Sequence, residues 1–432
     1  MSKKSLFVAF AAAVIVVWTR WGQASEPPIA PRVEATPGQR LPGKYVGFEP
    51  VVAADGEGRV VAAAIDHHSH RILVWTSADR GKTFALPHPT LLPPEALQNE
   101  GDPLLQAVGG QFFLTLMAQQ PKKRGMDGYL LRSADGGKAW KKVHTFSGGK
   151  GDVDRPLCAF SPNGRRAAYF CTGRIEAMFS SDGAATWTPA PSAVLPSNKS
   201  GNPYGIAIND DGRAILSYVD RDKNLELAVT RDGGKTWRRH RFGSQTEKGR
   251  IPTAEEEEAG VTMWASGVAL AQDDEGTVHA LSAQRAEKGE SIDVWYRSSQ
   301  DGDSWSKPMQ LSSSRAAIKA HPAIASAGKR VHAIWLECEE RWCRVCYRGS
   351  LDGGKTWSEP ITVSKPERPS ELMTKKGFRT FSGHYMGVAE DGRGITHIVW
   401  GVMKRGLLKE GEGEIWHASV HLLGKVQGKL PQ

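Results

Sequence analysis

The sequence has few of the features that indicate helices, metal centres or membrane spans. Five cysteines are spread over 432 residues, and no second pair or suitably spaced histidine completes a zinc site around Cys343 and Cys346. No convincing stretch has a helical hydrophobic period, and no apolar run after residue 24 is long enough to span a bilayer. Phosphate loops, nucleophile elbows and nucleic-acid modules do not occur. With 47 glycines and 25 prolines, the chain is rich in turns, and the sequence predicts an all-β protein.

The N-terminus reads as an export signal. Lys3 and Lys4 precede an apolar run from Leu6 to Trp18, and Gly22-Gln23-Ala24 offers a small-x-small cleavage site. We therefore predict a signal peptide over residues 1–24, cleaved after Ala24, with an uncleaved anchor as the alternative. The protein is then secreted or periplasmic, with no membrane span in the mature chain. The formal charge of +9 is shared along the sequence rather than gathered into a stripe.

One short motif recurs six times and indicates the architecture. Variants of Ser-x-Asp-x-Gly-x-Thr-Trp carry aspartates separated by 56, 47, 50, 69 and 51 positions, and these are Asp79, Asp135, Asp182, Asp232, Asp301 and Asp352. The polar side chains can bond backbone N–H groups of a tight turn, and the terminal Trp or Phe opens the next strand with a buried ring. A period near 50 residues predicts repeated units, none of which can bury its own apolar face.

A second repeat, a strand pair joined by a short turn, precedes each motif and occurs seven times. The copies begin at Glu49, Asp102, Asp154, Asn202, Ser266, His321 and His384. A third strand follows each pair, and in six cases the Asp-containing motif leads into a fourth, so the unit is a four-stranded antiparallel blade. We predict a seven-bladed β-propeller over residues 49–423, with six blades as the alternative. Residues 25–48 are expected to supply the closing strand, and residues 424–432 form a tail.

These repeats resemble those of the sialidase-like superfamily, called bacterial neuraminidase or Asp-box repeats, over nearly the whole mature chain. The resemblance implies a propeller. It does not decide the activity, because glycosidases, lectin-like proteins and noncatalytic assembly factors share the motif.

The residues that begin the innermost strands are the candidate site. Radial symmetry would bring them together at one end of the central channel, and prolines that follow several of them would fix their direction. Glu49, Asp102 and Asp154 could act as acid and base on a glycosidic bond. With His321 and His384 they could also hold a divalent cation, although no cofactor is required. Arg155 and Asn202 are expected to bind ligand, Arg155 through a bidentate contact to an acidic sugar.

The sialidase resemblance implies further candidates, but the match is incomplete. Sialidases begin their first blade with Arg-Ile-Pro, whereas this chain has Phe48-Glu49-Pro50 there. Tyr385 stands near the position of a nucleophilic tyrosine, and Arg155 and Arg379 could be part of a carboxylate clamp. Trp264 lies in an expected loop and could stack on a sugar ring.

The leading hypothesis is an exported propeller that binds a glycan or another extracellular polymer at the channel mouth. The alternatives are a glycoside hydrolase of sialidase-like type and an assembly factor that grips a partner protein; a nucleic-acid partner is not expected. Cys338 and Cys343 flank a four-residue turn and are expected to form a disulfide.

Overall fold

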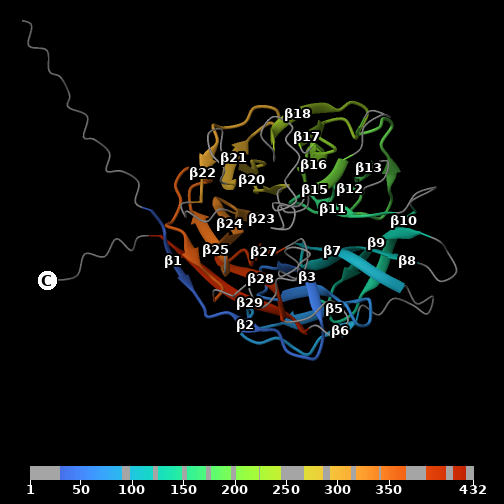
Figure 1. The fold of residues 1–432 in the computed structure, drawn as a ribbon. Coiled ribbons are helices and arrows are strands. Elements are labelled where there is room, and N and C mark those ends of the chain that lie inside the picture. Colours follow the sequence, from blue (N-terminus) through green and yellow to red (C-terminus); the bar gives the residue numbers. More distant parts are fainter. Residues whose placement is uncertain are drawn as a thin grey trace, which may run out of the picture.

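The computed structural model describes residues 30–89, 98–119, 125–147, 153–171, 177–195, 201–222, 224–244, 267–285, 292–312, 318–339, 342–365, 386–404 and 412–424. Within these ranges every regular element is a β-strand, and no helix has the length and apolarity to cross a membrane. Seven antiparallel sheets surround a central channel (Figure 1). The predictions of an all-β fold and of seven blades are confirmed.

Each blade has four strands in chain order from the channel to the rim, apart from the last. Blades 1 to 3 consist of β3 (Gly47–Ala54), β4 (Val60–Asp66), β5 (Arg71–Ser77), β6 (His88–Pro89); β7 (Gln98–Val108), β8 (Gln111–Gln119), β9 (Met126–Ser133), β10 (Lys141–Phe146); and β11 (Leu157–Phe160), β12 (Ala167–Phe170), β13 (Ala177–Ser180), β14 (Thr188–Pro189). Blades 4 to 6 consist of β15 (Gly201–Ile208), β16 (Ala214–Asp220), β17 (Asn224–Thr230), β18 (Arg238–Ser244); β19 (Val268–Gln272), β20 (Val278–Arg285), β21 (Ile292–Ser299), β22 (Met309–Gln310); and β23 (Ile318–Ala327), β24 (Arg330–Glu339), β25 (Trp342–Ser350), β26 (Ile361–Thr362).

Blade 7 joins the two ends of the chain. It contains β27 (Gly387–Glu390), β28 (Ile395–Lys404) and β29 (Glu412–Leu423), and its outer strand is β1 (Arg32–Ala35). A second short strand, β2 (Gln39–Arg40), also pairs with β29. In Figure 1 the blue N-terminal strand β1 lies beside the red strand β29. Pairing both ends of the chain within one sheet removes an edge that could pair with other chains.

The six Asp-box motifs form turns at the ends of the third strands. In blade 6, Asp352 accepts hydrogen bonds from the hydroxyls of Ser350 at 2.8 Å and Thr356 at 2.6 Å. The N–H of Gly354 donates to the Ser350 hydroxyl at 2.8 Å. In blade 3, the hydroxyl and N–H of Thr186 lower the pKa of Asp182 to about 2. These carboxylates are held by their own turns, so they stabilise the fold rather than form a ligand site.

Arginines connect neighbouring blades on the Asp-box face. Four blades carry an arginine at the start of the second strand, and each donates to a backbone carbonyl in the hairpin turn of the next blade. The pairs are Arg59 with Gly110 at 2.8 Å, Arg166 with Asp210 at 2.7 Å, Arg213 with Gly276 at 2.6 Å and Arg330 with Gly392 at 3.4 Å. Charge-assisted bonds between successive blades help to hold the ring together.

Two buried histidines lie where the ring closes. His397 Nδ1 of β28 is 3.1 Å from His417 Nε2 of β29, and the side chains are 0% and 1% exposed. Gly81 of the first Asp-box turn packs on both rings, since a Cβ there would lie 2.8 Å from His417 and 2.9 Å from His397. Burial lowers the pKa of His397 to about 4 and that of His417 to about 3. Both imidazoles are therefore neutral at pH 7.

Candidate functional site

The innermost strands share a distorted start. Glu49, Asp102, Arg155 and His321 have φ values of 54°, 45°, 49° and 51°, a region that residues other than glycine rarely adopt, and each precedes a proline. In blades 1, 2 and 6 the strand register shifts at this point, as in a β-bulge. A bulge re-aims the side chain that it carries, and strain of this kind, on the order of 1–3 kcal/mol per residue, is often found at functional sites.

In blade 3 the residue with the positive φ is Arg155, whereas the sequence repeat had aligned Asp154 with Glu49 and Asp102. Asp154 therefore stands one position earlier, and its side chain lies next to Asp102 of blade 2. The two carboxyl groups are hydrogen-bonded to each other, and the N–H of Arg155 donates to Asp102 Oδ2 at 3.0 Å. Burial and the neighbouring Asp102 carboxylate raise the pKa of Asp154 to about 6, against the opposing charge of Arg155. Asp154 is therefore protonated in mildly acidic solution.

Arg155 connects this carboxyl pair with Tyr204 of blade 4. Its side chain is 4% exposed, and its guanidinium carbon lies 5.3 Å from the centre of the Tyr204 ring. Tyr204 follows Asn202 and Pro203 at the start of β15, and its ring packs against the backbone of blade 5 at Gly267. The sequence analysis missed Tyr204, although an aromatic residue directly after a strand-start proline was a usable signal.

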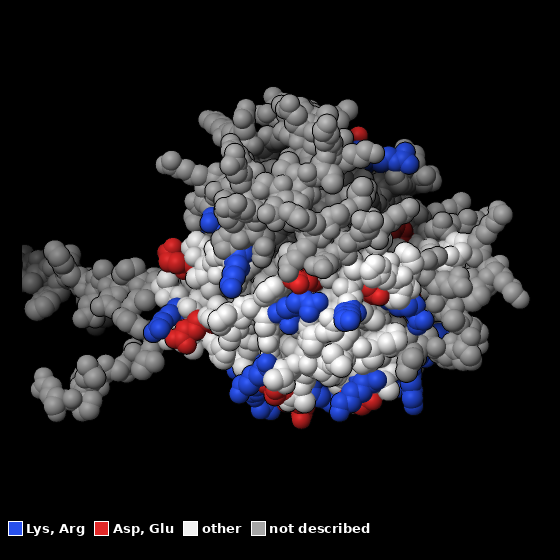
Figure 2. Space-filling model, turned by 60° about the horizontal axis from the view of Figure 1, so that its bottom comes forward, with Lys and Arg blue, Asp and Glu red and all other residues white. Residues whose placement is uncertain are grey.

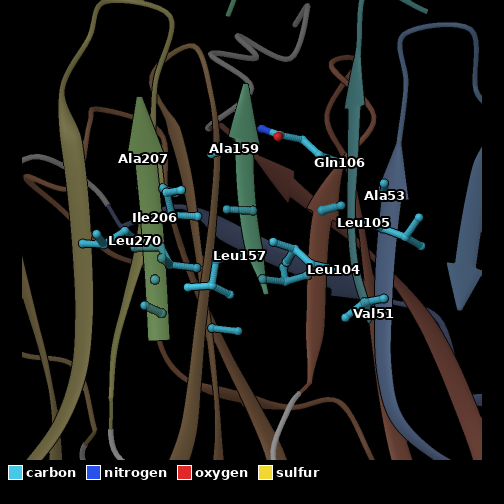
Figure 3. Close-up of a pocket in the computed structure, with 18 of the residues that line it drawn as sticks. Val51, Ala53, Leu104, Leu105, Gln106, Leu157, Ala159, Ile206, Ala207 and Leu270 are labelled. Carbon is cyan, nitrogen blue, oxygen red and sulfur yellow. The ribbon is translucent and has the colours of Figure 1, made fainter. Parts of the chain in front are cut away.

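The side chains that line the channel below these residues are mainly apolar. A cavity of about 530 Å³ is lined by all seven innermost strands, with Asp102 and Arg155 at the end where the strands begin. Figure 3 shows the side chains of Val51, Leu105, Leu157 and Ile206 directed into this space. Gln272, Asp274 and Glu390 line its other end. We call Asp102, Asp154, Arg155 and Tyr204 the mouth cluster. It lies at the end of the channel where the innermost strands begin.

The remaining predicted site residues are placed as follows. Glu49, which is 5% exposed, and the partly buried Asn202 and His321 occupy the strand starts of their own blades. They are not among the described residues that line the cavity. Trp264, Arg379, His384 and Tyr385 lie outside the described residues.

Among the residues that are described, no three His, Cys, Asp or Glu side chains lie close enough together to hold a metal ion. Cys338 and Cys343 are register partners in β24 and β25, while their side chains lie outside the described part.

These features define a class of protein, a seven-bladed β-propeller with a polar cluster at the start of its innermost strands. No family model and no curated protein matches the sequence. The fold is similar to that of the phage phi92 endosialidase, with a TM-score of 0.50 and 9% identity over 91% of this chain and 70% of that chain. It is also similar to an ulvan lyase of polysaccharide lyase family PL25, with a TM-score of 0.51 and 9% identity over 89% and 96% of the two chains. A Trypanosoma rangeli sialidase matches with a TM-score of 0.47 and 12% identity over 72% and 58%. The likeness in fold that the Asp-box repeats predicted is confirmed, and at these identities it concerns the fold alone.

The carboxyl pair makes a prediction about stability. Because the pKa of Asp154 is raised in the folded protein, the folded state binds more protons than the unfolded state between about pH 4 and pH 6. The contribution of Asp154 to stability therefore falls as the pH rises through this window. Asp154→Asn removes the titration, so its melting temperature relative to wild type is expected to be higher at pH 7.5 than at pH 4. Thermal melts across this range would refute the pairing if the difference did not change with pH.

Proposed function

We propose that this protein binds a glycan at the channel mouth, and that Asp102, Asp154 and Arg155 contact it. The observation that carries the proposal is the hydrogen-bonded carboxyl pair beside a buried guanidinium at the opening of a cavity of about 530 Å³. The remaining oxygens of the two carboxyl groups are hydrogen-bond acceptors, which suit sugar hydroxyls as donors. The guanidinium of Arg155 adds donors for a ring oxygen or an acidic substituent.

Two further observations support a glycan as the ligand. The phenol of Tyr204, beside Arg155, gives the cluster a further hydrogen-bonding group for a sugar hydroxyl. The similar solved folds include an endosialidase and a polysaccharide lyase, both of which are named for reactions on glycans. We further propose that residues 1–24 direct the protein to the periplasm or the exterior, where such polymers occur.

The second candidate is a glycoside hydrolase, and the raised pKa of Asp154 is the observation that favours it. A carboxylic acid that stays protonated near pH 6 is suited to donate a proton to a leaving oxygen. The hydrogen bond between Asp102 and Asp154 is closer than the separation of about 5 Å or more that glycosidases keep between their two carboxyl groups, which favours Glu49 as the second carboxylate. In a sialidase-like reaction the nucleophile would be Tyr385.

A glycan-array screen with matched variants tests the binding proposal. Asp102→Asn and Asp154→Asn are each expected to weaken binding at least tenfold, since each alters hydrogen bonds to a charged group that are worth about 1.5–3 kcal/mol. Asp274→Asn is the control, because Asp274 lines the opposite end of the same cavity. Binding that survives both mouth variants, or that fails equally in Asp274→Asn, would refute the proposal.

The same variants separate binding from catalysis. Release of reducing sugar from the bound glycan identifies a hydrolase. If Asp154→Asn abolishes that release and retains binding, Asp154 is the acid of a glycoside hydrolase. If no wild-type release is observed while the mouth variants lose binding, the protein is a binding module.

A further inference from the structure

The outer edge of blade 4 carries a dense group of exposed cations. Arg231 and Lys235 lie in its Asp-box turn, and Arg238, Arg239 and Arg241 lie in the outer strand β18. All five side chains are exposed, and we call this set the blade 4 rim. The sequence indicated a positive charge that is shared along the chain rather than gathered into a stripe. The Asp-box turn and outer strand of neighbouring blade 3, from Ser180 to Pro189, contain no Lys or Arg, so the charge is concentrated locally.

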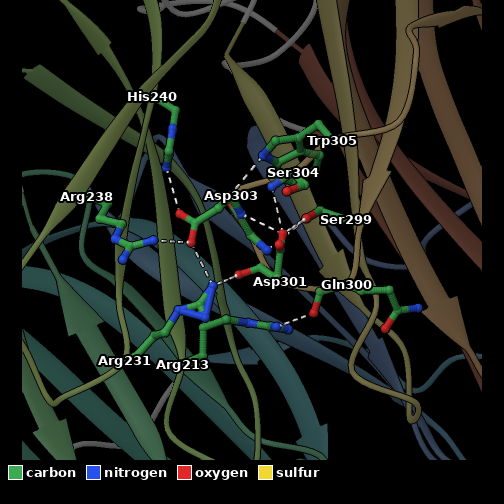
Figure 4. Close-up of polar contacts among 11 residues, drawn as sticks. Arg213, Arg231, Arg238, His240, Ser299, Gln300, Asp301, Asp303, Ser304 and Trp305 are labelled. Atoms are coloured by element: carbon green, nitrogen blue, oxygen red, sulfur yellow. Dashed lines mark hydrogen bonds and ion pairs between the residues drawn. The ribbon is translucent and has the colours of Figure 1, made fainter.

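One side of β18 is fixed to blade 5 by Asp303. This residue belongs to the shortened fifth Asp-box, and Figure 4 shows its carboxylate facing three side chains of blade 4. Asp303 lies 2.8 Å from Arg231, 3.1 Å from Arg238 and 2.8 Å from His240 Nε2. Arg238 nevertheless stays 72% exposed and Arg231 45% exposed. Asp303 therefore orients these cations and leaves most of the Arg238 surface open to solvent.

The other side of β18 presents Arg239 and Arg241, because successive residues of a strand point to opposite faces. Arg239 Nε donates to the carbonyl of Val194 at 2.8 Å, and Arg241 donates to Asn224. Among the described residues, the neighbouring acids are mostly engaged elsewhere: Asp232 and Asp301 are bonded within their own turns and Asp220 to Asn224, while Glu226 stands opposite Arg241 in the register. Asp303 bonds two of the five cations. On the face shown in Figure 2, cationic side chains are scattered, with anionic side chains among them.

We propose that the blade 4 rim is a binding surface for an acidic polysaccharide, separate from the mouth cluster. Four of its five cations are arginines, whose planar guanidinium groups bind sulfate and carboxylate through two parallel hydrogen bonds. Residues on one face of a strand are about 7 Å apart, so β18 sets out a row of cations along which an extended anionic chain can lie.

The chemistry of the rim favours a polysaccharide over a nucleic acid or a membrane. Single-stranded nucleic acids need exposed aromatic rings for stacking, whereas the ring nearest to the rim, Trp237, packs on Phe170 and Phe179. Membrane association needs exposed apolar side chains beside the cations. Among the described residues the exposed large hydrophobic side chains are Leu86, Met309 and Leu423, none of which belongs to the rim.

Binding to immobilised heparin, with neutral dextran as the comparison polymer, tests this surface. The wild-type protein is expected to bind heparin and not dextran, and to be released as salt rises. Arg239→Gln with Arg241→Gln should weaken heparin binding about tenfold while the protein stays folded at the assay temperature, because the bonds that are lost, to Val194 and Asn224, lie at the outer edge of blade 4. The matched control is Lys141→Gln with Lys142→Gln, which removes the same charge from the equivalent strand of blade 2.

The outcomes are distinct. Equal losses in the two double variants would show that net charge alone causes the binding and would overturn the proposal. Tighter binding to DNA than to heparin at the same salt concentration, weakened by the rim variant, would assign the surface to nucleic acid instead. The rim variant is expected to leave unchanged the binding of uncharged array glycans, which Asp102→Asn and Asp154→Asn are expected to weaken, so failure of the mouth proposal and failure of the rim proposal can be told apart.

Discussion

Replacing Trp357 with alanine is expected to lower the free energy of unfolding by about 3–5 kcal/mol. Trp357 ends the sixth Asp-box and is 6% exposed. Its ring meets Tyr296 of blade 5 edge-on at 4.9 Å, and its Nε1 donates to the Gly354 carbonyl at 3.0 Å. The substitution therefore leaves a cavity between two blades, in a core that also includes Trp335.

Denaturant unfolding at neutral pH checks this expectation. Leu86→Ala is the control, because Leu86 is 71% exposed and its truncation should change stability by less than about 0.5 kcal/mol. A loss below about 1 kcal/mol for Trp357→Ala would mean that the blades close around the missing ring. The Asp-box aromatic residues would then contribute little to the contact between blades.

Acidification is expected to weaken the closure of the ring through His397 and His417. Both residues have pKa values lowered to about 4 and about 3 in the folded protein, while an unfolded histidine titrates near 6.5. The unfolded state therefore binds more protons as the pH falls from about 6.5 to about 4. Each histidine that stays neutral in the folded state then costs about 1.4 kcal/mol of stability per pH unit.

Other groups surround this pair and have to be separated from it. Asp391 and Arg80 face His397 from the β27–β28 turn and from blade 1, His421 lies on β29, and Gln39 of β2 is 3.4 Å from His417 Nδ1. In blades 5 and 6 a tyrosine takes the place of His417, and its hydroxyl lies 2.8 Å from the Nδ1 of His279 or His332. The variant His417→Tyr copies these blades and removes one titrating group.

His417→Tyr is therefore expected to reduce the fall in stability between pH 6.5 and pH 4.5. Urea unfolding at a series of pH values measures the slope for each protein. The same slope in the variant and in the wild type would mean that His417 does not contribute to acid sensitivity.

The sequence predicted the architecture because its signals are local. Each Asp-box encodes a turn through side chains only four residues apart, as the bonds from Asp352 to Ser350 and Thr356 illustrate. Seven strand pairs against six boxes were enough to predict the blade count. The missing seventh box corresponds to the blade that receives its outer strand, β1, from the other end of the chain.

The site could be predicted only in part, because it depends on register and on contacts between blades. The strand-start residues were the predicted set, and of these Asp102 and Arg155 line the channel. The repeat could not show that blade 3 is offset by one residue, which pairs Asp154 with Asp102 and places Arg155 against Tyr204. The blade 4 rim was missed because a count of charges along a sequence does not reveal which of them are exposed on one edge.

The pairing of β1 with β29 also determines at what stage of synthesis the ring of blades can close. The partner of Arg32 is Leu423, so the earliest strand of the chain finds its place only after nearly all of the polypeptide has been synthesised. Until then blades 1 and 7 cannot enclose the histidine pair, and a growing chain offers unpaired backbone at both ends. A truncated product that ends before residue 412 would lack β29, and we expect it to aggregate or to be degraded rather than persist as a smaller ring.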